Sequence, residues 1–400
     1  MLHAPNATIA ALLSSSTDAK PAEADARAAP ELTVLSSAPE RVSGGDALIS
    51  LALNGAKSSD VRLLLNGKDV TSSLLAMPGE DSRVGVIDGM VEGRNVLTAA
   101  RRTGKSTSLI LTNYPITGPI FSGSRLTPYI CQTDHFALPD GSSLGPALDR
   151  DCSARTKVIH LYKSTKAKRF LPLATGEAVP DDVAGVTTLD GKRVRYVVRF
   201  EAGTIDRGVY NIAIPHDPER DPQIAEVAAP AGWARRLLWV HGFGCPGGWY
   251  YQGTNTGSLD AIYPPGAPRQ NTVEAGFNVM RDEWLSKGYA VATSTLNHPS
   301  ISCNPILAAE ATAMVKEHFI EQFGVPLFIL STGSSGGAYS SLQIADVFPG
   351  LFDGVLIGSV FPDALSIALS AMDARLLLHY FAREDTSPFS DAHLAGRMPR

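Results

Sequence analysis

The stretch Val325–Asp346, VPLFILSTGSSGGAYSSLQIAD, decides the expected fold. An apolar strand ends near Leu330, a run of small residues follows, and a helical pattern begins beyond Gly337. The G-x-S-x-G pattern at residues 333–337 is short enough to occur by chance, but a serine nucleophile requires this strand-turn-helix setting with small residues on either side. The stretch therefore predicts Ser335 as a nucleophile on a strained turn. The alternative is a tight turn with no serine chemistry.

Two backbone N–H groups are expected to face the negative charge that forms when a serine attacks a carbonyl. The first belongs to Gly336, at the start of the helix, where the helix dipole adds to its effect. The second is expected from the turn VHGFGCPGG, which follows an apolar strand and ends at Gly248. Phe243 or Gly244 is the predicted donor. A phosphate-binding loop is the alternative, but the glycines after His241 do not form a clean helix-opening G-x-G-x-x-G fingerprint, and no acidic residue lies at the right place.

Strand and helix patterns alternate after Arg193. Short apolar strands separated by helices are typical of a parallel sheet covered on both faces. An amphipathic helix is predicted over residues 272–288. Another is predicted with Asn304 as its N-cap, Pro305 at its first position and Gly324 at its end. The fold class is therefore predicted as α/β, with a mostly parallel sheet and an antiparallel hairpin added to one edge.

Four segments are predicted along the chain. Residues 1–30 have the Ala, Pro, Ser, Asp and Glu composition of a disordered leader. Residues 31–115 show short aliphatic runs separated by turn signals such as Asn66-Gly67, which favours a small antiparallel β-sandwich resembling an immunoglobulin-like domain. Residues 116–192, rich in Pro, Gly, Asp and Ser, are predicted to be an irregular connector, and residues 193–400 to be the α/β domain.

The segments HGFG (residues 241–244) and GSSGG (333–337) resemble the α/β-hydrolase superfamily, and the resemblance covers residues 193–369. More narrowly, YPITGPIFSG, EAGTIDRGVYNIA and STGSSGGAYSSLQIADVFPGLFDGV resemble a little-characterised bacterial family of secreted hydrolases with an N-terminal β domain, a domain of unknown function. This closer match covers most of the chain beyond Tyr114. The superfamily implies acyl-transfer chemistry with the chain order Ser, acid, His. The narrower family implies no settled substrate.

That order requires both the acid and the histidine to follow Ser335. Asp363, just after a predicted strand, is the favoured acid, although the superfamily usually places it one strand later. His379 lies on a predicted lid helix and is expected to be a cap residue, whereas His241 precedes the nucleophile and is expected to be structural. The remaining candidates after the serine are Asp346, Asp353, Asp373, Glu384, Asp385, Asp391 and His393.

No further buried strand is predicted after residue 358, although the hydrolase fold needs more strands to carry its acid and base. We therefore expect a C-terminally incomplete fold. On this hypothesis the 400 residues are the N-terminal part of a longer protein, or a fragmentary gene product, and the catalytic histidine lies beyond Arg400.

The four cysteines, Cys131, Cys152, Cys245 and Cys303, show no CxxC spacing, so zinc and thioredoxin chemistry are not expected. Two disulfides, Cys131 with Cys152 and Cys245 with Cys303, are predicted; the alternative is buried free thiols. Such disulfides favour the periplasm or the outside of the cell. The N-terminus, however, lacks the basic n-region and long h-region of a signal peptide.

The predicted function is hydrolysis of a carboxylic ester through an acyl-enzyme on Ser335, with no metal or organic cofactor. A net charge of −5 without long runs of one sign gives no reason to expect nucleic acid or an anionic membrane as partner. No apolar run reaches the roughly 18 residues that span a bilayer. The expected partner is a small-molecule or oligomeric ester, with Trp249, Tyr250 and Tyr251 lining its pocket or packing in the core. The alternatives are an acyltransferase on the same fold and a catalytically inactive binding or scaffold protein.

Overall fold

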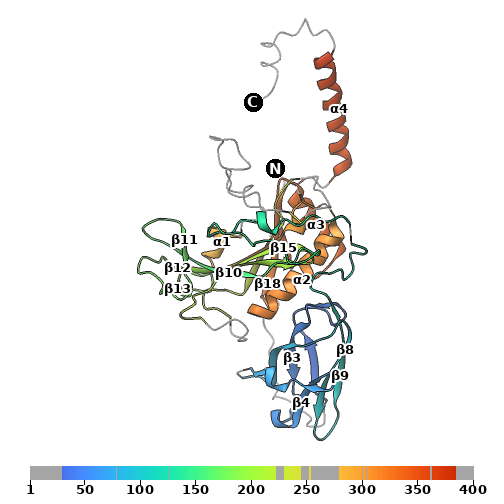
Figure 1. The fold of residues 1–400 in the computed structure, drawn as a ribbon, viewed down its shortest axis with the longest axis vertical. Coiled ribbons are helices and arrows are strands. Elements are labelled where there is room, and N and C mark those ends of the chain that lie inside the picture. The colour runs from blue at the N-terminus through green and yellow to red at the C-terminus, as the bar shows by residue number, and fades with distance from the viewer. Residues whose placement is uncertain are drawn as a thin grey trace, which may run out of the picture. The chain divides into compact units, whose positions relative to one another are not determined.

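The computed structural model divides the chain into two compact units, Met1–Pro115 and Ile116–Arg400 (Figure 1). The structure describes residues 29–77, 79–125, 127–221, 229–244, 252–253, 279–299, 301–302, 304–360 and 363–383. Almost all of the predicted leader therefore lies outside the described residues.

The first unit contains two sheets that share one core. One sheet has the order β1-β3-β7-β6 and the other β2-β9-β8-β4-β5. Ile49, Leu63 and Leu97 are fully buried in one cluster, and they come from strands of both sheets, so the sheets pack face to face. The strands are β1 (Glu31–Val34), β2 (Val42–Ser43), β3 (Asp46–Ala52), β4 (Val61–Leu65), β5 (Lys68–Asp69), β6 (Leu75–Ala76), β7 (Ser82–Asp88), β8 (Gly93–Arg101) and β9 (Thr107–Tyr114).

The predicted turn at Asn66-Gly67 is present between β4 and β5. Both residues have positive φ, 50° and 85°, which is the backbone that a two-residue hairpin turn requires. Short 3-10 helices complete this unit: η1 (Pro39–Arg41), η2 (Ser58–Asp60) and η3 (Thr71–Ser73).

The second unit is built on one large mixed sheet with the order β11-β10-β14-β15-β17-β16-β18-β19. The pairs from β17 to β19 are parallel, whereas the four pairs from β11 to β17 are antiparallel. The predicted antiparallel hairpin is confirmed as β14 and β15, although it lies inside the sheet and not at one edge. The prediction of a mostly parallel sheet is wrong, because four of these seven pairs are antiparallel. The strands are β10 (Lys157–Lys163), β11 (Phe170–Leu173), β14 (Val197–Ile205), β15 (Gly208–Pro215), β16 (Arg236–Val240), β17 (Tyr289–Ser294), β18 (Phe328–Ser334) and β19 (Gly354–Gly358).

Two of these strands, β10 and β11, lie within residues 116–192, where the sequence indicated an irregular connector. Only Leu161 is buried in β10, because this strand lies near the edge of the sheet. Its sequence, KVIHLYK, therefore carries charged and polar residues at several positions, and the apolar period is weak. The shorter strand β12 (Gly185–Thr187), in the same region, pairs with β13 (Arg193–Arg195), which follows it, and the two form a separate sheet.

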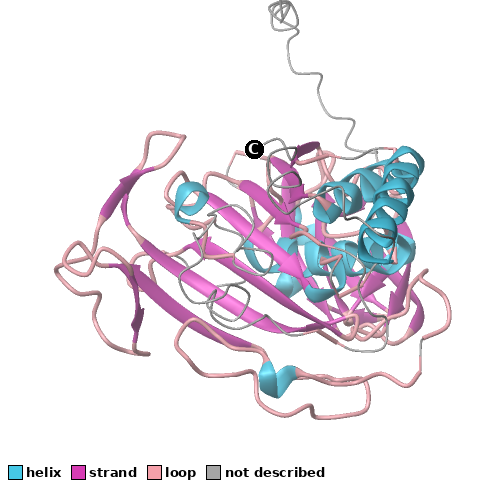
Figure 2. Cartoon of the chain, turned by 90° about the horizontal axis from the view of Figure 1, so that it is seen from above, coloured by secondary structure: helices cyan, strands magenta, loops and turns pink. Residues whose placement is uncertain are grey.

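The helices of the second unit are α1 (Asp282–Leu285), α2 (Pro305–Phe323), α3 (Gly336–Val347) and α4 (Ala364–Arg383), with 3-10 turns η4 (Thr133–His135) and η6 (Thr295–Asn297). Helices α2 and α3 lie together at one end of the large sheet, whereas the short α1 lies towards its other end (Figure 1 and Figure 2). The predicted helix over residues 272–288 is wrong in its described part, where only α1 is helical. In the part of the chain that the structure describes, no helix combines the length and apolarity needed to cross a bilayer.

Helix α2 begins and ends where the sequence predicts. The side chain of Asn304 accepts hydrogen bonds from the backbone N–H groups of Ile306 and Leu307, at 3.1 and 3.2 Å, so it is the N-cap. Pro305 occupies the first position, and Gly324, with φ of 86°, ends the helix. Phe319 on its buried face packs edge-on against Trp233, with ring centroids 5.4 Å apart.

A buried carboxylate, Glu201 on β14, joins α2 to the sheet. It is fully buried and accepts hydrogen bonds from Tyr210 at 2.6 Å and from the ring of His318 at 2.7 Å, and Arg199 lies 2.6 Å away. Burial acts to raise the pKa of Glu201, but the hydrogen bond from His318 and the charges of His318 and Arg199 lower it to about 2.

This pKa predicts a loss of stability in acid. Because the folded pKa is depressed, the stabilisation is present above the ordinary pKa of 4.5 and is lost as the pH falls towards 2. We expect the wild type to lose about 3 kcal/mol of unfolding free energy over this range in excess of the loss shown by Glu201→Gln. Urea titrations at pH 5.5 and 2.5 measure the difference. Equal losses in the two proteins would contradict the assignment.

Candidate active site

Three segments meet at the carboxyl ends of the central parallel strands of the large sheet. Strands β16, β17 and β18 are parallel neighbours, so the residues that follow them lie at the same edge. These residues are 241–244 after β16, the turn η6 and His298 after β17, and Ser335 after β18. The predicted nucleophile and the predicted oxyanion turn are therefore neighbours in space.

Ser335 has a strained backbone between β18 and α3. Its φ is 54° and its ψ is −118°, a conformation that residues other than glycine rarely adopt. Its N–H donates to the carbonyl of Gly358 at 3.2 Å, and its carbonyl accepts from Ala338 and Tyr339. The side chain does not cap the helix, and the residue is partly exposed. The hydroxyl therefore stands at a sharp strand-to-helix turn and is not used to hold the helix.

Glycines around Ser335 are required by close backbone contacts. A Cβ on Gly333 would lie 2.4 Å from the backbone of Gly337, and a Cβ on Gly337 would lie 2.0 Å from the carbonyl oxygen of Gly242. A Cβ on Gly336 would lie 1.8 Å from the carbonyl oxygen of Gly244. Since the obstacles are backbone atoms, no side-chain movement would relieve them.

The same contacts place the turn after β16 against the start of α3. The carbonyl of Gly242 accepts a hydrogen bond from Ser334 at 3.1 Å, and the backbone N of Phe243 lies 3.3 Å from the position of a Cβ on Gly337. The structure thus brings Ser335, Gly336, Phe243 and Gly244 together.

His298 also reaches this place, although the chain order Ser, acid, His does not select it. Its ring packs edge-on against the ring of Phe243, with centroids 5.4 Å apart, and the next residue, Pro299, lies 3.3 Å from the position of a Cβ on Gly336. Burial lowers the pKa of His298 to about 4. Its place directly after a parallel strand is the sequence signal that points to this edge of the sheet.

His241 lies in the interior beneath the turn. The residue is fully buried, and its ring packs edge-on against Phe352, with centroids 5.5 Å apart. Its backbone N–H donates to the carbonyl of Thr332 at 2.8 Å. Burial lowers the pKa of His241 to about 3, so the imidazole is neutral at pH 7. This setting fits a structural residue that joins β16 to β18.

The candidate acids and histidines after Ser335 lie in several places. Asp353 accepts a hydrogen bond from the N–H of Ile329 at 2.7 Å. It therefore lies at the amino-terminal end of β18, opposite the end that carries Ser335. Asp346 on α3 is exposed, and so are Asp363 just before α4 and the pair Asp373 and His379 on α4. Glu384, Asp385, Asp391 and His393 lie outside the described residues, as do Cys245, Cys303 and the aromatic residues 249–251.

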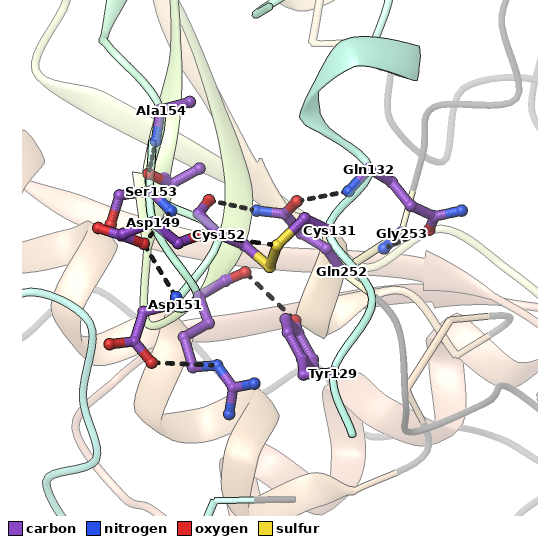
Figure 3. The surroundings of a disulfide bond; sticks show 12 residues. Tyr129, Cys131, Gln132, Asp149, Asp151, Cys152, Ser153, Ala154, Gln252 and Gly253 are labelled. Atoms are coloured by element: carbon purple, nitrogen blue, oxygen red, sulfur yellow. Dashed lines mark hydrogen bonds and ion pairs between the residues drawn. A yellow bond between two sulfur atoms is a disulfide. The ribbon is translucent and has the colours of Figure 1, made fainter. Parts of the chain in front are cut away.

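The predicted disulfide between Cys131 and Cys152 is confirmed, with Cα atoms 5.1 Å apart (Figure 3). It lies beside Gln252, which is fully buried. The amide of Gln252 donates to the carbonyl of Cys152 at 2.9 Å and accepts from the N–H of Gln132 at 2.9 Å. The disulfide therefore anchors residues 252–253, which follow the glycine-rich turn in the chain.

Removing this disulfide is expected to destabilise the protein. The two cysteines are 21 residues apart, and closing a loop of this length stabilises a fold by about 3 kcal/mol. The double variant Cys131→Ser, Cys152→Ser should lose about this unfolding free energy in denaturant titrations, and reduced wild type should match it. A double variant as stable as oxidised wild type would contradict the prediction.

Among the described residues, no group of three or more histidine, cysteine or acidic side chains is arranged to hold a metal ion. What the second unit does present is a large mixed sheet flanked by helices, with a strained strand-serine-helix turn at one edge and a glycine-rich turn packed against it. The chain belongs to a tannase-like family of unknown function (DUF6351), whose model matches residues 32–396. A comparison with curated proteins gives no match.

Proposed function

We propose that this protein is a serine-dependent hydrolase of carboxylic esters and that Ser335 is its nucleophile. The observation that carries the proposal is the positive φ of Ser335, 54°, at a strand-to-helix turn packed too closely for any residue but glycine at its flanks. Such strain is typical of serine nucleophiles on α/β sheets. The tannase-like family supports the proposal, because tannase is an esterase of the α/β-hydrolase type.

The proposed reaction proceeds through an acyl-enzyme. The hydroxyl oxygen of Ser335 attacks the ester carbonyl while its proton passes to a histidine base, for which His298 and His379 are the described candidates. The N–H of Gly336 and that of Phe243 or Gly244 stabilise the oxyanion. The alcohol leaves with a proton from the histidine, and water then releases the acid. Asp363 is the proposed partner of the base.

The disulfide supports a location in an oxidising compartment, so we propose that the protein works in the periplasm or outside the cell. The proposed partner is a small or oligomeric ester. The proposed reaction requires no metal ion, since an activated serine and two N–H donors are sufficient for ester hydrolysis.

The function is tested by covalent labelling. A fluorophosphonate probe should modify the full chain once, and peptide mass spectrometry should map the adduct to Ser335. Ester turnover assayed with and without added alcohol then separates hydrolysis from acyl transfer, because a transferase forms a new ester when the alcohol is present. An unlabelled, folded chain would reject the enzyme in favour of a binding protein.

A further inference from the structure

A cavity lies at the carboxyl ends of the parallel strands, on the same side of the large sheet as Ser335. It has a volume of about 50 Å³ and is lined by residues that include Arg125, Tyr129, Asp206, Arg207 and Asn304. Tyr210 on β15 pairs with Ser294, the last residue of β17, so the turn between β14 and β15 projects beyond the carboxyl ends of the parallel strands. That turn consists of Asp206 and Arg207.

The turn holds Arg207 in a strained position. Asp206 and Arg207 have positive φ, 52° and 66°, which is the backbone of a two-residue hairpin turn usually made of Asn and Gly. An arginine at such a position costs about 1 kcal/mol, and strain of this kind persists where the side chain is needed. Gly208 follows the turn and lies so close to Leu296 that a Cβ on it would be 2.7 Å from the Leu296 Cγ. The turn therefore cannot shift towards Leu296.

The guanidinium of Arg207 is held in place, and its ion pair with Asp151 is long. It lies over the ring of Tyr129, 3.8 Å from the centroid, and the Tyr129 hydroxyl donates to the Arg207 carbonyl at 3.2 Å. The side chain is only 10% exposed, and its Nε is 4.0 Å from Asp151, beyond hydrogen-bonding distance. Among the residues that the structure describes, this buried Nε has no hydrogen-bond partner. A buried donor without a partner costs about 1 to 3 kcal/mol, which a ligand acceptor would recover.

The other cation at the cavity, Arg125, is already paired. Arg125 donates to Asp151 at 2.7 Å and to the Thr117 hydroxyl at 3.0 Å. Burial and the neighbouring Glu310 raise the pKa of Asp206 well above its ordinary value, which favours the neutral carboxyl and weakens its repulsion of an anion. Arg207 is therefore the positive charge left for a ligand.

Helix α2 fixes the wall of the cavity opposite the turn. Glu310, fully buried on α2, accepts hydrogen bonds from the N–H groups of Ile120, Phe121 and Ser122 and from the Ser122 hydroxyl. These bonds hold the loop that carries Arg125 against the helix that carries the cavity residue Leu307. The Cys131–Cys152 disulfide fixes the segment that carries Tyr129 (Figure 3). The cavity is thus formed before any ligand binds.

We propose that this cavity binds a carboxylate group of the substrate, with Arg207 as its main partner. A volume of about 50 Å³ accommodates a few water molecules or one small oxyanion. The inference rests on the proposed function of Ser335 and names its substrate class, an elongated ester that carries a second, free acid group. Three strand spacings separate the β14-β15 turn from β18, so the carboxylate would lie about 14 Å from the scissile carbonyl along the sheet edge.

The binding arm of the test does not depend on catalysis. Benzoate and inorganic phosphate are titrated into the Ser335→Ala chain by calorimetry, and the titrations are repeated with Arg207→Gln and Arg207→Lys in that background. We expect benzoate to bind about tenfold or more weakly with Arg207→Gln and to an intermediate degree with Arg207→Lys, because lysine keeps the charge but loses the planar donors. Arg150→Gln, at an exposed arginine next to Asp151, is the matched control and should bind as well as its parent. Unchanged affinity in Arg207→Gln, or no benzoate binding at all, would overturn the site.

The kinetic arm distinguishes a substrate carboxylate from a free anion. Two esters that differ only in a distal carboxylate or its methyl ester are compared by kcat/KM in wild type, Arg207→Gln and Arg150→Gln. The preference for the acid should fall about tenfold in Arg207→Gln alone. A wild type that does not prefer the acid, or phosphate that binds more tightly than benzoate, would make the ligand a free anion and overturn the substrate class. If no ester turns over, the role of Ser335 fails, and the binding arm alone then decides whether the cavity holds a carboxylate.

Discussion

Replacing Ser335 by alanine is expected to abolish fluorophosphonate labelling and to lower ester turnover by about 10³-fold or more. The alanine removes the only atom that forms the acyl-enzyme, whereas oxyanion donors alone leave a small residual rate. The fold should survive, because the hydroxyl caps no helix. Alanine also loses no hydrogen-bonded backbone group, since the bonds of residue 335 to Gly358 and Ala338 are backbone bonds.

Ser334→Ala is the matched control for this prediction. Ser334 is the last residue of β18, next to the proposed nucleophile and in the same glycine-rich pentapeptide. Its backbone bond to Gly242 remains in the variant, so turnover and labelling should stay within an order of magnitude of wild type. Equal activity of the two variants, or an adduct that persists in Ser335→Ala, would assign the nucleophile elsewhere.

Replacing Gly337 by alanine is expected to lower turnover by about 10²-fold while Ser335 is intact. The new methyl group would lie 2.0 Å from the carbonyl oxygen of Gly242, so the turn at residues 242–244 must move away from α3. Loss of one oxyanion donor costs roughly this factor. Overpacking should also destabilise the fold by about 1 to 3 kcal/mol, although alanine favours a helix more than glycine does.

Gly185→Ala provides the comparison for Gly337→Ala, because a Cβ at Gly185 meets its nearest neighbours at ordinary contact distances of 3.8 and 3.9 Å. Steady-state kinetics and thermal melts of both variants check the prediction. A folded Gly337→Ala variant that turns over at the wild-type rate would contradict the prediction, because the contact between residue 337 and the Gly242 carbonyl would then have no effect on catalysis.

The elements that the sequence predicted best have local causes. Helix α2 follows from Asn304, Pro305 and Gly324, whose capping and stopping effects act within one turn of the chain. The turn at Ser335 follows from two flanking glycines and an apolar strand, all within a dozen residues. In each case the residues that determine the conformation are those that adopt it.

The features that the sequence missed depend on contacts between distant segments. The antiparallel half of the large sheet arises because β10 pairs with β14 and β15 pairs with β17, and no local pattern fixes which strands become neighbours. The cavity at Arg207 joins a hairpin turn, a loop and the start of α2. Its residues look like ordinary turn and loop residues until the sheet places them together.

The favoured acid, Asp363, and the lid role of α4 remain predictions. Asp363 was selected from its position after a strand, and that strand, β19, is present at the edge of the sheet. The choice of a base depends on which histidine approaches Ser335 during the reaction. A chain-order rule drawn from a superfamily gave no weight to His298, which precedes the serine but packs against Phe243.

At the hairpin turn of Asp206 and Arg207, the residues that would give the most stable hairpin differ from those that the proposed ligand binding requires. Asn-Gly at these two positions would adopt the same backbone without strain, so selection for stability alone would favour it. Such a replacement would leave the sheet intact and remove Arg207 from the cavity, where Arg125 remains. If the cavity binds a carboxylate as proposed, a lineage that keeps arginine here accepts a weaker hairpin for that ligand, and drift towards Asn-Gly would mark relatives that bind a different one.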